Sequence, residues 1–475
     1  MRLLPGVRPL PSREAAATFA IVLALTVGGG SRAHSALGPR YGGELRIALA
    51  ESATTLAPSV PRGLTERILA ALVHEVLVDV DDEGRPRPAL VQSWASAAEG
   101  REWTLRLAPA TFHDGTAVGS ADAVRGLRRF LRADSVAAAH LARVLEGGDD
   151  FRRRGSEALP GITAIDDARI VLRFRLPAAV PLAPLASPAA AIVSPRGAGA
   201  GPFVPTTPPS ARGISVTAFG RHVRGRPFLD VVRLVSAAPD RASRSEVAVP
   251  DVGPAATPSP PANGLLLLLL DPAAPPLADA RTRALIAASV DRAQLARHFL
   301  PGGEPAESLL APTLLAPLPV PSPRAAPGPA TLAGRLVLRV ASDVPQSASQ
   351  RVVAHLTALG LEVQAVAASA GPASSQPRLL VWYPEVAEAG LALEELAALA
   401  GSAAPIRSAL EAADGLRDFD RRRAELQRVE ESLRAGHVLV PLARVPLPLG
   451  ARPGVHALRA TASGSLVVED AWVEP

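Results

Sequence analysis

The residue pair that first suggests chemistry is His113 and Asp114, in the run Phe112-His113-Asp114-Gly115. An imidazole beside a carboxylate could transfer protons as a general acid–base pair. The same run is typical of a tight turn, in which Asp114 accepts hydrogen bonds from backbone amides and Gly115 takes a positive φ. We favour the turn, because the regular segments on either side already account for the run.

Other catalytic signatures are missing from the sequence. It contains no Gly-x-Ser-x-Gly elbow, no His-Glu-x-x-His and no Gly-x-x-x-x-Gly-Lys. The glycine-rich run 197–201 follows no predicted strand and precedes a proline, which argues against a nucleotide loop. We therefore expect a protein that is not an enzyme, has no catalytic residues and uses no cofactor.

Metal ligands are equally sparse. The chain has no cysteine, which excludes disulfides and thiolate ligands, and its nine histidines are scattered without a pair at ligand spacing. The sequence predicts no metal site.

Alternating and helical patterns follow one another along the chain, which is typical of an α/β protein. Leu64 to Val76 predicts a helix, Ser120 is expected to cap the next one, and Leu277 to Phe299 is predicted to be mostly helical. Further helices are predicted at 350–359 and 419–433, and strands at 45–49, 103–107, 170–174, 216–219, 231–235, 265–270, 336–340, 379–382 and 438–440.

Short segments in a fixed order carry a family resemblance. They are Gly42–Ala48, Leu56–Pro58, Pro88–Trp94, Trp103–Leu107, Thr111–Gly115, Ala121–Val124, Gly199–Phe203, Asp279–Arg283 and Val290–Arg292. In order and spacing the series resembles the extracytoplasmic solute-binding proteins of ABC importers, in the peptide- and nickel-binding subfamily (family 5). The resemblance extends from residue 41 to about residue 475.

This resemblance implies a periplasmic-binding-protein type II fold, with two α/β lobes around a cleft and an extra domain. Lobe I is expected to comprise 36–57, 162–262 and 444–475, the extra domain 58–161, and lobe II 263–443. A lobe assembled from separate stretches makes the crossings between lobes a hinge.

The resemblance also points to ligand-binding residues. Peptide-binding relatives pair the ligand's ammonium group with an acidic residue three positions after a tryptophan. Here Trp382 ends a buried strand and Glu385 stands three residues later, where the family usually has Asp. Glu385 is either this ammonium partner or an exposed loop acid, and Trp382 is either a cleft wall or core.

A second stretch, Ser52-Ala53-Thr54-Thr55, matches a loop that faces the cleft in relatives. The hydroxyls of Ser52, Thr54 and Thr55 could bind a peptide main chain. The alternative is a turn that these side chains stabilise locally.

The first 35 residues predict an export signal. Arg2, Arg8 and Arg13 precede an apolar run from Ala15 to Val27, and cleavage is expected before Ala36. Without cysteine the chain has no acceptor for a lipid anchor, so a free periplasmic protein is expected. The formal net charge of +5 is mild for 475 residues and indicates no nucleic-acid partner.

We therefore expect a monomeric periplasmic receptor that captures a small peptide-like solute and passes it to ABC transporter permease subunits. The alternative is a secreted interaction or sensor protein that kept the fold but not transport.

Overall fold

Three sheets and the helices around them form the part of the chain that the computed structural model describes. The described residues are 38–49, 55–58, 61, 63–177, 179–210, 212–236, 247–249, 264–318, 332–368, 376–447, 450–451 and 453–474. Residues 40–475 pack as one unit, and every contact described below lies within it. The predicted signal segment, 1–35, lies outside the described residues.

The first sheet, on which lobe I is built, has the strand order β18-β11-β1-β10-β9-β8. Its strands are β1 (Glu44–Leu49), β8 (Phe203–Pro205), β9 (Gly213–Ala218), β10 (Val231–Ser236), β11 (Val247–Val249) and β18 (Gly450–Ala451). Strand β1 runs parallel to both neighbours, and helix α2 (Leu64–Val73) packs onto this core. The apolar stripe predicted for this helix is confirmed, because Ile68, Leu69, Leu72 and Val73 are all buried.

The second sheet forms lobe II and has the order β13-β17-β12-β16-β14-β15. Its strands are β12 (Gly264–Leu269), β13 (Glu304–Pro305), β14 (Gly334–Val340), β15 (Leu361–Ala367), β16 (Arg378–Trp382) and β17 (Leu439–Val445). The unbroken leucine run in β12 is explained by cover on both faces. Leu266 and Leu268 enter one hydrophobic cluster, whereas Leu265 and Leu267 enter another on the opposite side.

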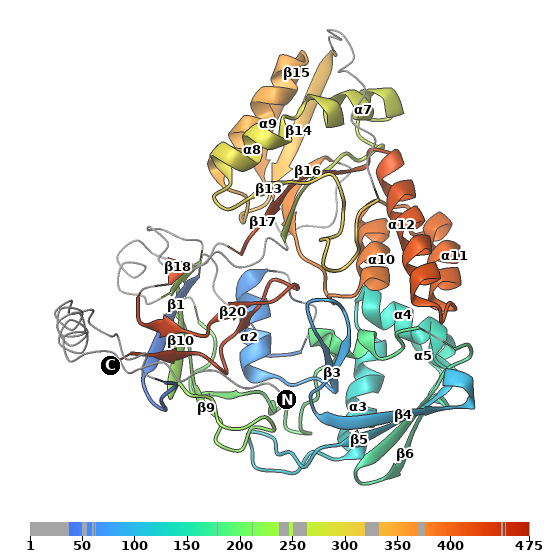
Figure 1. Ribbon diagram of the computed structural model, residues 1–475, viewed down its shortest axis with the longest axis vertical. Helices are drawn as coiled ribbons and strands as arrows, with labels where there is room; N and C mark the ends of the chain where they lie inside the picture. Colours follow the sequence, from blue (N-terminus) through green and yellow to red (C-terminus); the bar gives the residue numbers. More distant parts are fainter. Residues whose placement is uncertain are drawn as a thin grey trace, which may run out of the picture. The chain divides into compact units, whose positions relative to one another are not determined.

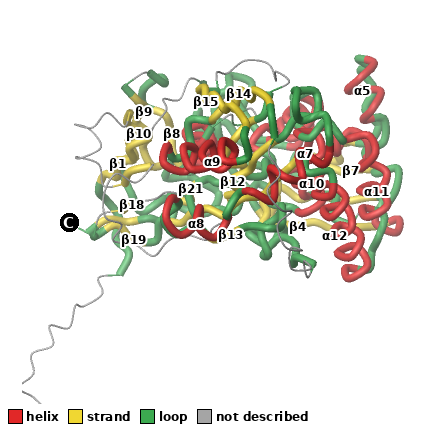
Figure 2. The backbone as a smooth tube through the Cα atoms, turned by 90° about the horizontal axis from the view of Figure 1, so that it is seen from above, coloured by secondary structure: helices red, strands yellow, loops and turns green. Residues whose placement is uncertain are grey.

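Six helices cover lobe II: α7 (Ala280–Ser289), α8 (Arg292–Phe299), α9 (Gln346–Ala358), α10 (Ala389–Leu399), α11 (Ala403–Asp414) and α12 (Phe419–Ala435). Helix α9 lies along β15 in Figure 1, and Figure 2 shows α10, α11 and α12 packed as neighbours. The helix predicted over 277–299 is two helices. Asp279 caps α7, and Asp291 starts α8 by accepting a hydrogen bond from the Gln294 amide at 2.8 Å.

The third sheet, on which the extra domain is built, is antiparallel with the order β4-β5-β7-β6. It contains β4 (Val91–Ala97), β5 (Glu102–Leu107), β6 (Ile162–Asp166) and β7 (Arg169–Arg173), and it packs with α3 (Ser120–Leu131), α4 (Val136–Val144) and α5 (Gly148–Arg154). Because β6 and β7 pair with β5, this sheet continues past the boundary predicted at residues 161 and 162. The cap of α3 is Gly119 rather than Ser120, since the Gly119 amide bonds the Asp122 carboxylate.

Short two-stranded pairs and 3₁₀ turns complete the described elements. The pairs are β2 (Val78–Val80) with β3 (Pro86–Pro88), β19 (Val455–His456) with β22 (Trp472–Val473), and β20 (Arg459–Ala460) with β21 (Leu466–Val467). The 3₁₀ turns are Ala98–Gly100, Ala183–Ala186 and Pro188–Ala190.

The turn at residues 112–115 and the segment 199–203, two motifs of the sequence, are in contact. The His113 amide and its ring Nε2 lie 2.8 and 2.9 Å from the carbonyl oxygens of Gly199 and Gly201, respectively. The Gly201 amide bonds the Val73 carbonyl at 3.0 Å, and a Cβ on Gly199 would lie 2.1 Å from that oxygen. The glycines are therefore needed where two backbones touch.

The turn predicted at His113-Asp114-Gly115 is confirmed. Asp114 Oδ1 accepts the Thr116 amide (3.1 Å) and hydroxyl (2.6 Å), and Gly115 has φ +84°. Asp114 Oδ2 accepts the Ser194 hydroxyl at 2.9 Å. These bonds give the aspartate a structural role in the turn.

Candidate functional site

The candidate site is the loop that follows β16, residues Trp382 to Glu385, which we call the capture loop. It leaves the middle of the second sheet, where β16 pairs with β12 on one side and β14 on the other. The loop then enters α10, whose N-cap Glu388 accepts the Leu391 amide at 2.9 Å. A strand and a capped helix therefore fix both ends of the loop.

Glu385 is buried, with 7 % of its surface exposed, and is not an exposed loop acid. Its Oε1 accepts hydrogen bonds from the Ser135 hydroxyl at 2.7 Å and the Ser187 hydroxyl at 2.5 Å. Ser135 caps α4 and Ser187 caps the 3₁₀ turn Pro188–Ala190. Both elements pack into the hydrophobic cluster of the third sheet, although residue 187 falls within the range predicted for lobe I, so both donors lie on the extra domain's side of this contact. The carboxylate is thus oriented by two hydroxyls and keeps lone-pair capacity, since a carboxylate can accept about four hydrogen bonds.

Trp382 lies in the core of lobe II, the second of the two interpretations that the sequence left open. It is 5 % exposed and belongs to the cluster on one face of the second sheet. Its indole Nε1 donates to Glu395 Oε1 at 3.1 Å, and the Glu385 amide donates to Glu395 Oε2 at 2.9 Å. One carboxylate therefore holds both ends of the capture loop.

The pKa of the Glu395 carboxyl group lies well above its ordinary value. Burial raises its pKa to about 7, and the nearby Glu385 charge adds to the rise, although the two donors and Arg67 oppose it. Glu395 belongs to no motif of the sequence, but one feature of the sequence does mark it. Glu394 and Glu395 interrupt the otherwise apolar helix Ala389–Leu399.

Arg67, on α2 of lobe I, reaches the same loop. Its guanidinium donates to the carbonyls of Tyr383 and Pro384, both at 3.4 Å, and to Ser463 at 2.9 Å. The nearby charges that favour its cation are Glu395, Glu385 and Asp343. Lobe I and the extra domain thus both bond the loop of lobe II.

Tyr383 points from the loop into a narrow space. A Cβ on Gly264 would lie 2.7 Å from the Tyr383 hydroxyl, and a Cβ on Gly464 would lie 2.6 Å from its ring. The ring packs against the lobe I cluster, and in the described ranges its buried hydroxyl has no hydrogen-bond partner. Burial raises the pKa of this phenol, which therefore stays protonated as a donor.

Of the second predicted stretch, only Thr55 lies within the described residues. Ser52 and Thr54 lie outside the described residues. Thr55 is exposed, and its hydroxyl accepts the Ala57 amide at 3.0 Å, which is the local turn bond of the alternative interpretation.

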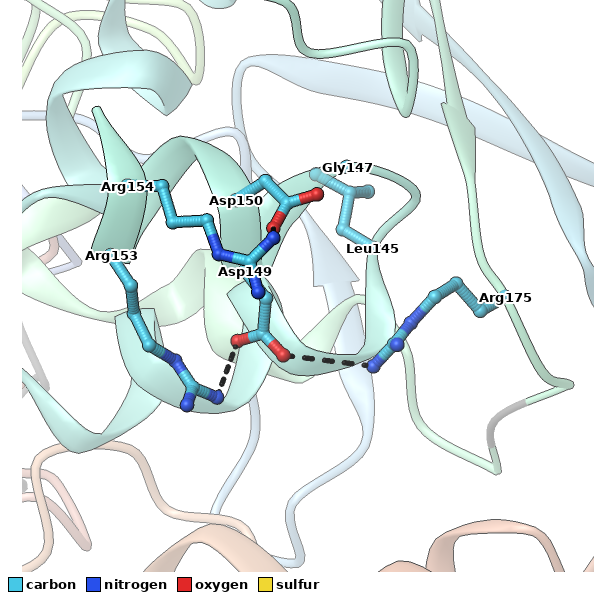
Figure 3. A pocket seen from close by; sticks show the side chains of 7 residues that line it. All are labelled: Leu145, Gly147, Asp149, Asp150, Arg153, Arg154 and Arg175. Carbon is cyan, nitrogen blue, oxygen red and sulfur yellow. Dashed lines mark hydrogen bonds and ion pairs between the residues drawn. The ribbon is translucent and has the colours of Figure 1, made fainter. Parts of the chain in front are cut away.

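A small cavity of about 10 Å³ is lined by Thr55 and His74, among others, and two larger cavities lie away from the capture loop. One of about 340 Å³ is lined by Leu145, Gly147, Asp149, Asp150, Arg153, Arg154 and Arg175. Figure 3 shows its charges paired with one another, Arg153 and Arg175 with Asp149 and Arg154 with Asp150. A hollow of about 520 Å³ lies over the third sheet beside Trp94 and Arg106.

Metal and membrane features were also examined by residue type. In the described ranges no three His, Asp or Glu side chains gather as a metal-binding group. None of the helices in those ranges combines the length and the apolar character that a membrane span needs.

Comparison with known proteins identifies the class. The family model of bacterial extracellular solute-binding proteins, family 5 Middle, matches residues 85–337, more than half of the chain. The chain belongs to this family, which consists of binding proteins rather than enzymes. No curated protein matches the chain in sequence.

Solved structures agree on the fold. The Helicobacter pylori periplasmic binding protein DppA, in complex with the peptide STSA, is similar with TM-score 0.76 and 16 % identity, covering 92 % of this chain and 99 % of that one. The Escherichia coli murein tripeptide binding protein MppA is similar with TM-score 0.77 and 18 % sequence identity, covering 92 % of this chain and 99 % of that one. The A. tumefaciens R10 protein AgaA, in complex with agropinic acid, is similar with TM-score 0.69 and 18 % sequence identity, covering 91 % of this chain and 99 % of that one. The predicted type II fold with two lobes and an extra domain is confirmed.

Proposed function

We propose that this protein is a periplasmic receptor, monomeric and without a nucleic-acid partner, that binds a small peptide-like solute between its lobes. It delivers that solute to the permease subunits of an ABC importer. Membership of the solute-binding family supports the receptor role, and the peptide complex of DppA and the description of MppA as a murein tripeptide binding protein support the ligand class.

One observation carries the proposal to particular residues. The Glu385 carboxylate is buried at the place where lobe II meets the extra domain, and two serine hydroxyls orient it. A peptide ammonium that reaches this carboxylate forms a charge-assisted hydrogen bond, which is shorter and stronger than a neutral one. Because the serines belong to the opposite side, separation of the lobes frees the carboxylate and closure buries the new pair.

The remaining predicted residues take supporting roles in the proposal. Trp382, bonded to Glu395, holds the capture loop in place, and the stretch that contains Ser52, Thr54 and Thr55 supplies hydroxyls for the peptide main chain. Ligand contacts on both sides favour the closed form, since only a difference in affinity between open and closed forms shifts their populations.

A panel of di- and tripeptides, each with a free and an N-acetylated amino terminus, tests this function by thermal shift and calorimetry. We expect saturable binding of free peptides and little binding of their acetylated forms, which lack the ammonium. Glu385→Gln should weaken binding at least thirtyfold, because losing one partner of a buried charged pair costs about 2 kcal/mol or more. Glu362→Gln, on an exposed carboxylate of β15, is the matched control and should bind as the wild type does.

Equal binding of acetylated and free peptides would remove Glu385 from the ammonium role. Failure of every peptide to bind the wild-type protein would contradict the ligand class.

A further inference from the structure

A second cluster of buried charges joins the extra domain to lobe II, away from the capture loop. His140 of α4 has its Nδ1 3.0 Å from Glu394 Oε2 of α10 and its Nε2 3.5 Å from Asp414 Oδ2 of α11. All three residues are buried, and their side chains are between 9 and 12 % exposed. Helix α4 lies against α10 and near the end of α11 (Figure 1).

The geometry favours the charged form of the histidine. Both ring nitrogens face carboxylate oxygens, and the imidazolium has an N–H for each of them, although Arg143 Nη2 also lies 3.5 Å from Nδ1. Burial and the nearby Arg143 charge lower the pKa of His140, but the hydrogen bond that its ring donates to Glu394 and the charges of Asp414 and Glu394 outweigh them, so the pKa is raised.

Other charges complete the cluster. On α4, Arg143 pairs with Glu394, and its Nε lies 3.8 Å from Glu411 Oε1 of α11. On α12, Arg422 lies 3.4 Å from Asp414 Oδ1 and 2.8 Å from Glu388 Oε1.

The carboxylates respond to these partners in opposite ways. Burial raises the pKa of Asp414, and for Glu394 burial is outweighed by its bonds to His140 and Arg143, so its pKa is lowered. Glu394 and Asp414 thus each pair with a cation on α4, and Asp414 also pairs with Arg422 on α12. The titration belongs to the coupled group rather than to one residue.

Chain connectivity does not hold this contact together. The second sheet and its helices form one continuous stretch, 264–445, which joins the rest only before β12 and after β17. Helix α4 lies outside that stretch and packs with the third sheet. Opening of the lobes can therefore part α4 from α10 and α11 and separate His140 and Arg143 from their carboxylate partners.

We propose that the His140 imidazolium is a proton-operated latch, which holds α4 against α10 and α11 and favours the lobe-closed form at acidic pH. The inference is independent of which solute the receptor binds. It goes beyond solute capture, because it makes closure respond to the pH of the compartment around the protein.

The direction of the pH effect on closure follows from the difference in proton affinity between the closed and open forms. The closed form binds the His140 proton more tightly than the open form, in which the imidazole has an ordinary pKa of about 6.5. The latch is therefore fully present below that pH and is lost as pH rises through the higher pKa of the closed form. Between the two values, the closed-to-open ratio should fall up to tenfold for each pH unit.

Paired spin labels measure this ratio directly, because the chain has no cysteine of its own. Ala121→Cys on α3 and Ala354→Cys on α9 place labels at exposed positions outside the cluster. Distances are recorded at pH 5.5, 7.0 and 8.5 on protein stripped of bound solute by unfolding, dialysis and refolding. We expect a short-distance population at pH 5.5 that gives way to a longer one at pH 8.5.

Two variants separate the latch from other titrations. His140→Gln should show the long-distance population at all three pH values. His456→Gln, which removes an exposed histidine paired with Glu474, should respond to pH as the parent does. A parent whose distances do not change with pH, or a His140→Gln protein that keeps the full response, would overturn the proposal.

A measurement on the unmutated protein covers the case in which His140→Gln does not fold. Nitrogen-15 NMR of the histidine rings, assigned with the help of the His456→Gln spectrum and of single-histidine labelling, gives the titration midpoint of His140. We expect a midpoint above 6.5, and a midpoint at or below that value would overturn the latch.

Discussion

At the scale of single residues, the capture loop is bonded to the rest of the protein through backbone and side-chain groups of all four of its residues. The Glu395 carboxylate accepts hydrogen bonds from the Trp382 indole and the Glu385 amide, and Arg67 donates to the carbonyls of Tyr383 and Pro384. The hydroxyls of Ser135 and Ser187 donate to the Glu385 carboxylate. A solute that binds here must replace some of these bonds. Its affinity is then the difference between two sets of contacts rather than the sum of one.

Glu395→Gln should remove a pH-dependent part of the stability. A pKa of about 7 in the folded protein, against about 4.3 unfolded, means that the folded state holds this proton more tightly. Stability from this group is therefore fully present below about pH 4.3 and declines as pH rises to about 7, by roughly 4 kcal/mol. Urea unfolding at pH 5 and pH 8 measures it.

The wild type should lose more stability between these two pH values than the Glu395→Gln protein does. Glu362→Gln is the control, because that side chain is exposed on β15. Identical pH dependence in the wild type and in Glu395→Gln would show that the Glu395 carboxyl is not held in its protonated form by the fold.

The sequence could predict some of these residues and not others. Glu385 was reachable because its distance from Trp382 along the chain is part of a family pattern. Arg67 was not, because its bonds to the loop join residues more than 300 positions apart and its helix shows only an ordinary amphipathic pattern. The partners of Glu385, Ser135 and Ser187, are likewise set by tertiary packing between separate domains.

At the scale of elements, most helices and strands could be predicted because periodicity is a local property. The differences arise at helix ends. Asp291 restarts a helix within a stretch predicted as mostly one helix, and the Asp122 side chain bonds the Gly119 amide one residue before the predicted cap. The third sheet crosses the predicted domain boundary because strand pairing is a tertiary property that periodicity does not reveal.

Gly199→Ala should destabilise the packing between helix α2 and the segment 199–203. The new Cβ would lie 2.1 Å from the Val73 carbonyl oxygen and 3.1 Å from the His74 ring, so backbone must move. We expect a loss of about 1–3 kcal/mol in the free energy of unfolding. Thermal or urea unfolding checks it.

Gly220→Ala is the matched control, because a Cβ at Gly220 meets nothing within 4 Å. It should leave the unfolding free energy nearly unchanged. If both glycine variants unfold alike, the close backbone contact at Gly199 does not constrain the sequence.

At the scale of the whole molecule, the described part of lobe II contacts its surroundings at several places, and Arg417, for example, donates to the Glu99 carbonyl. Two of these places contain buried charged groups. Arg67 and the serines meet the capture loop, and His140 with Arg143 meets α10 and α11. The first place is where we propose the solute binds, whereas the second responds to protons alone. Closure can therefore be adjusted without altering the residues that recognise the solute.

A crystal structure of the protein with the peptide that binds most tightly in the titration tests the central claim most directly. We predict the peptide between the lobes, with its ammonium nitrogen within hydrogen-bonding distance of the Glu385 carboxylate. A peptide seated elsewhere, with Glu385 still bonded only to Ser135 and Ser187, would contradict the account.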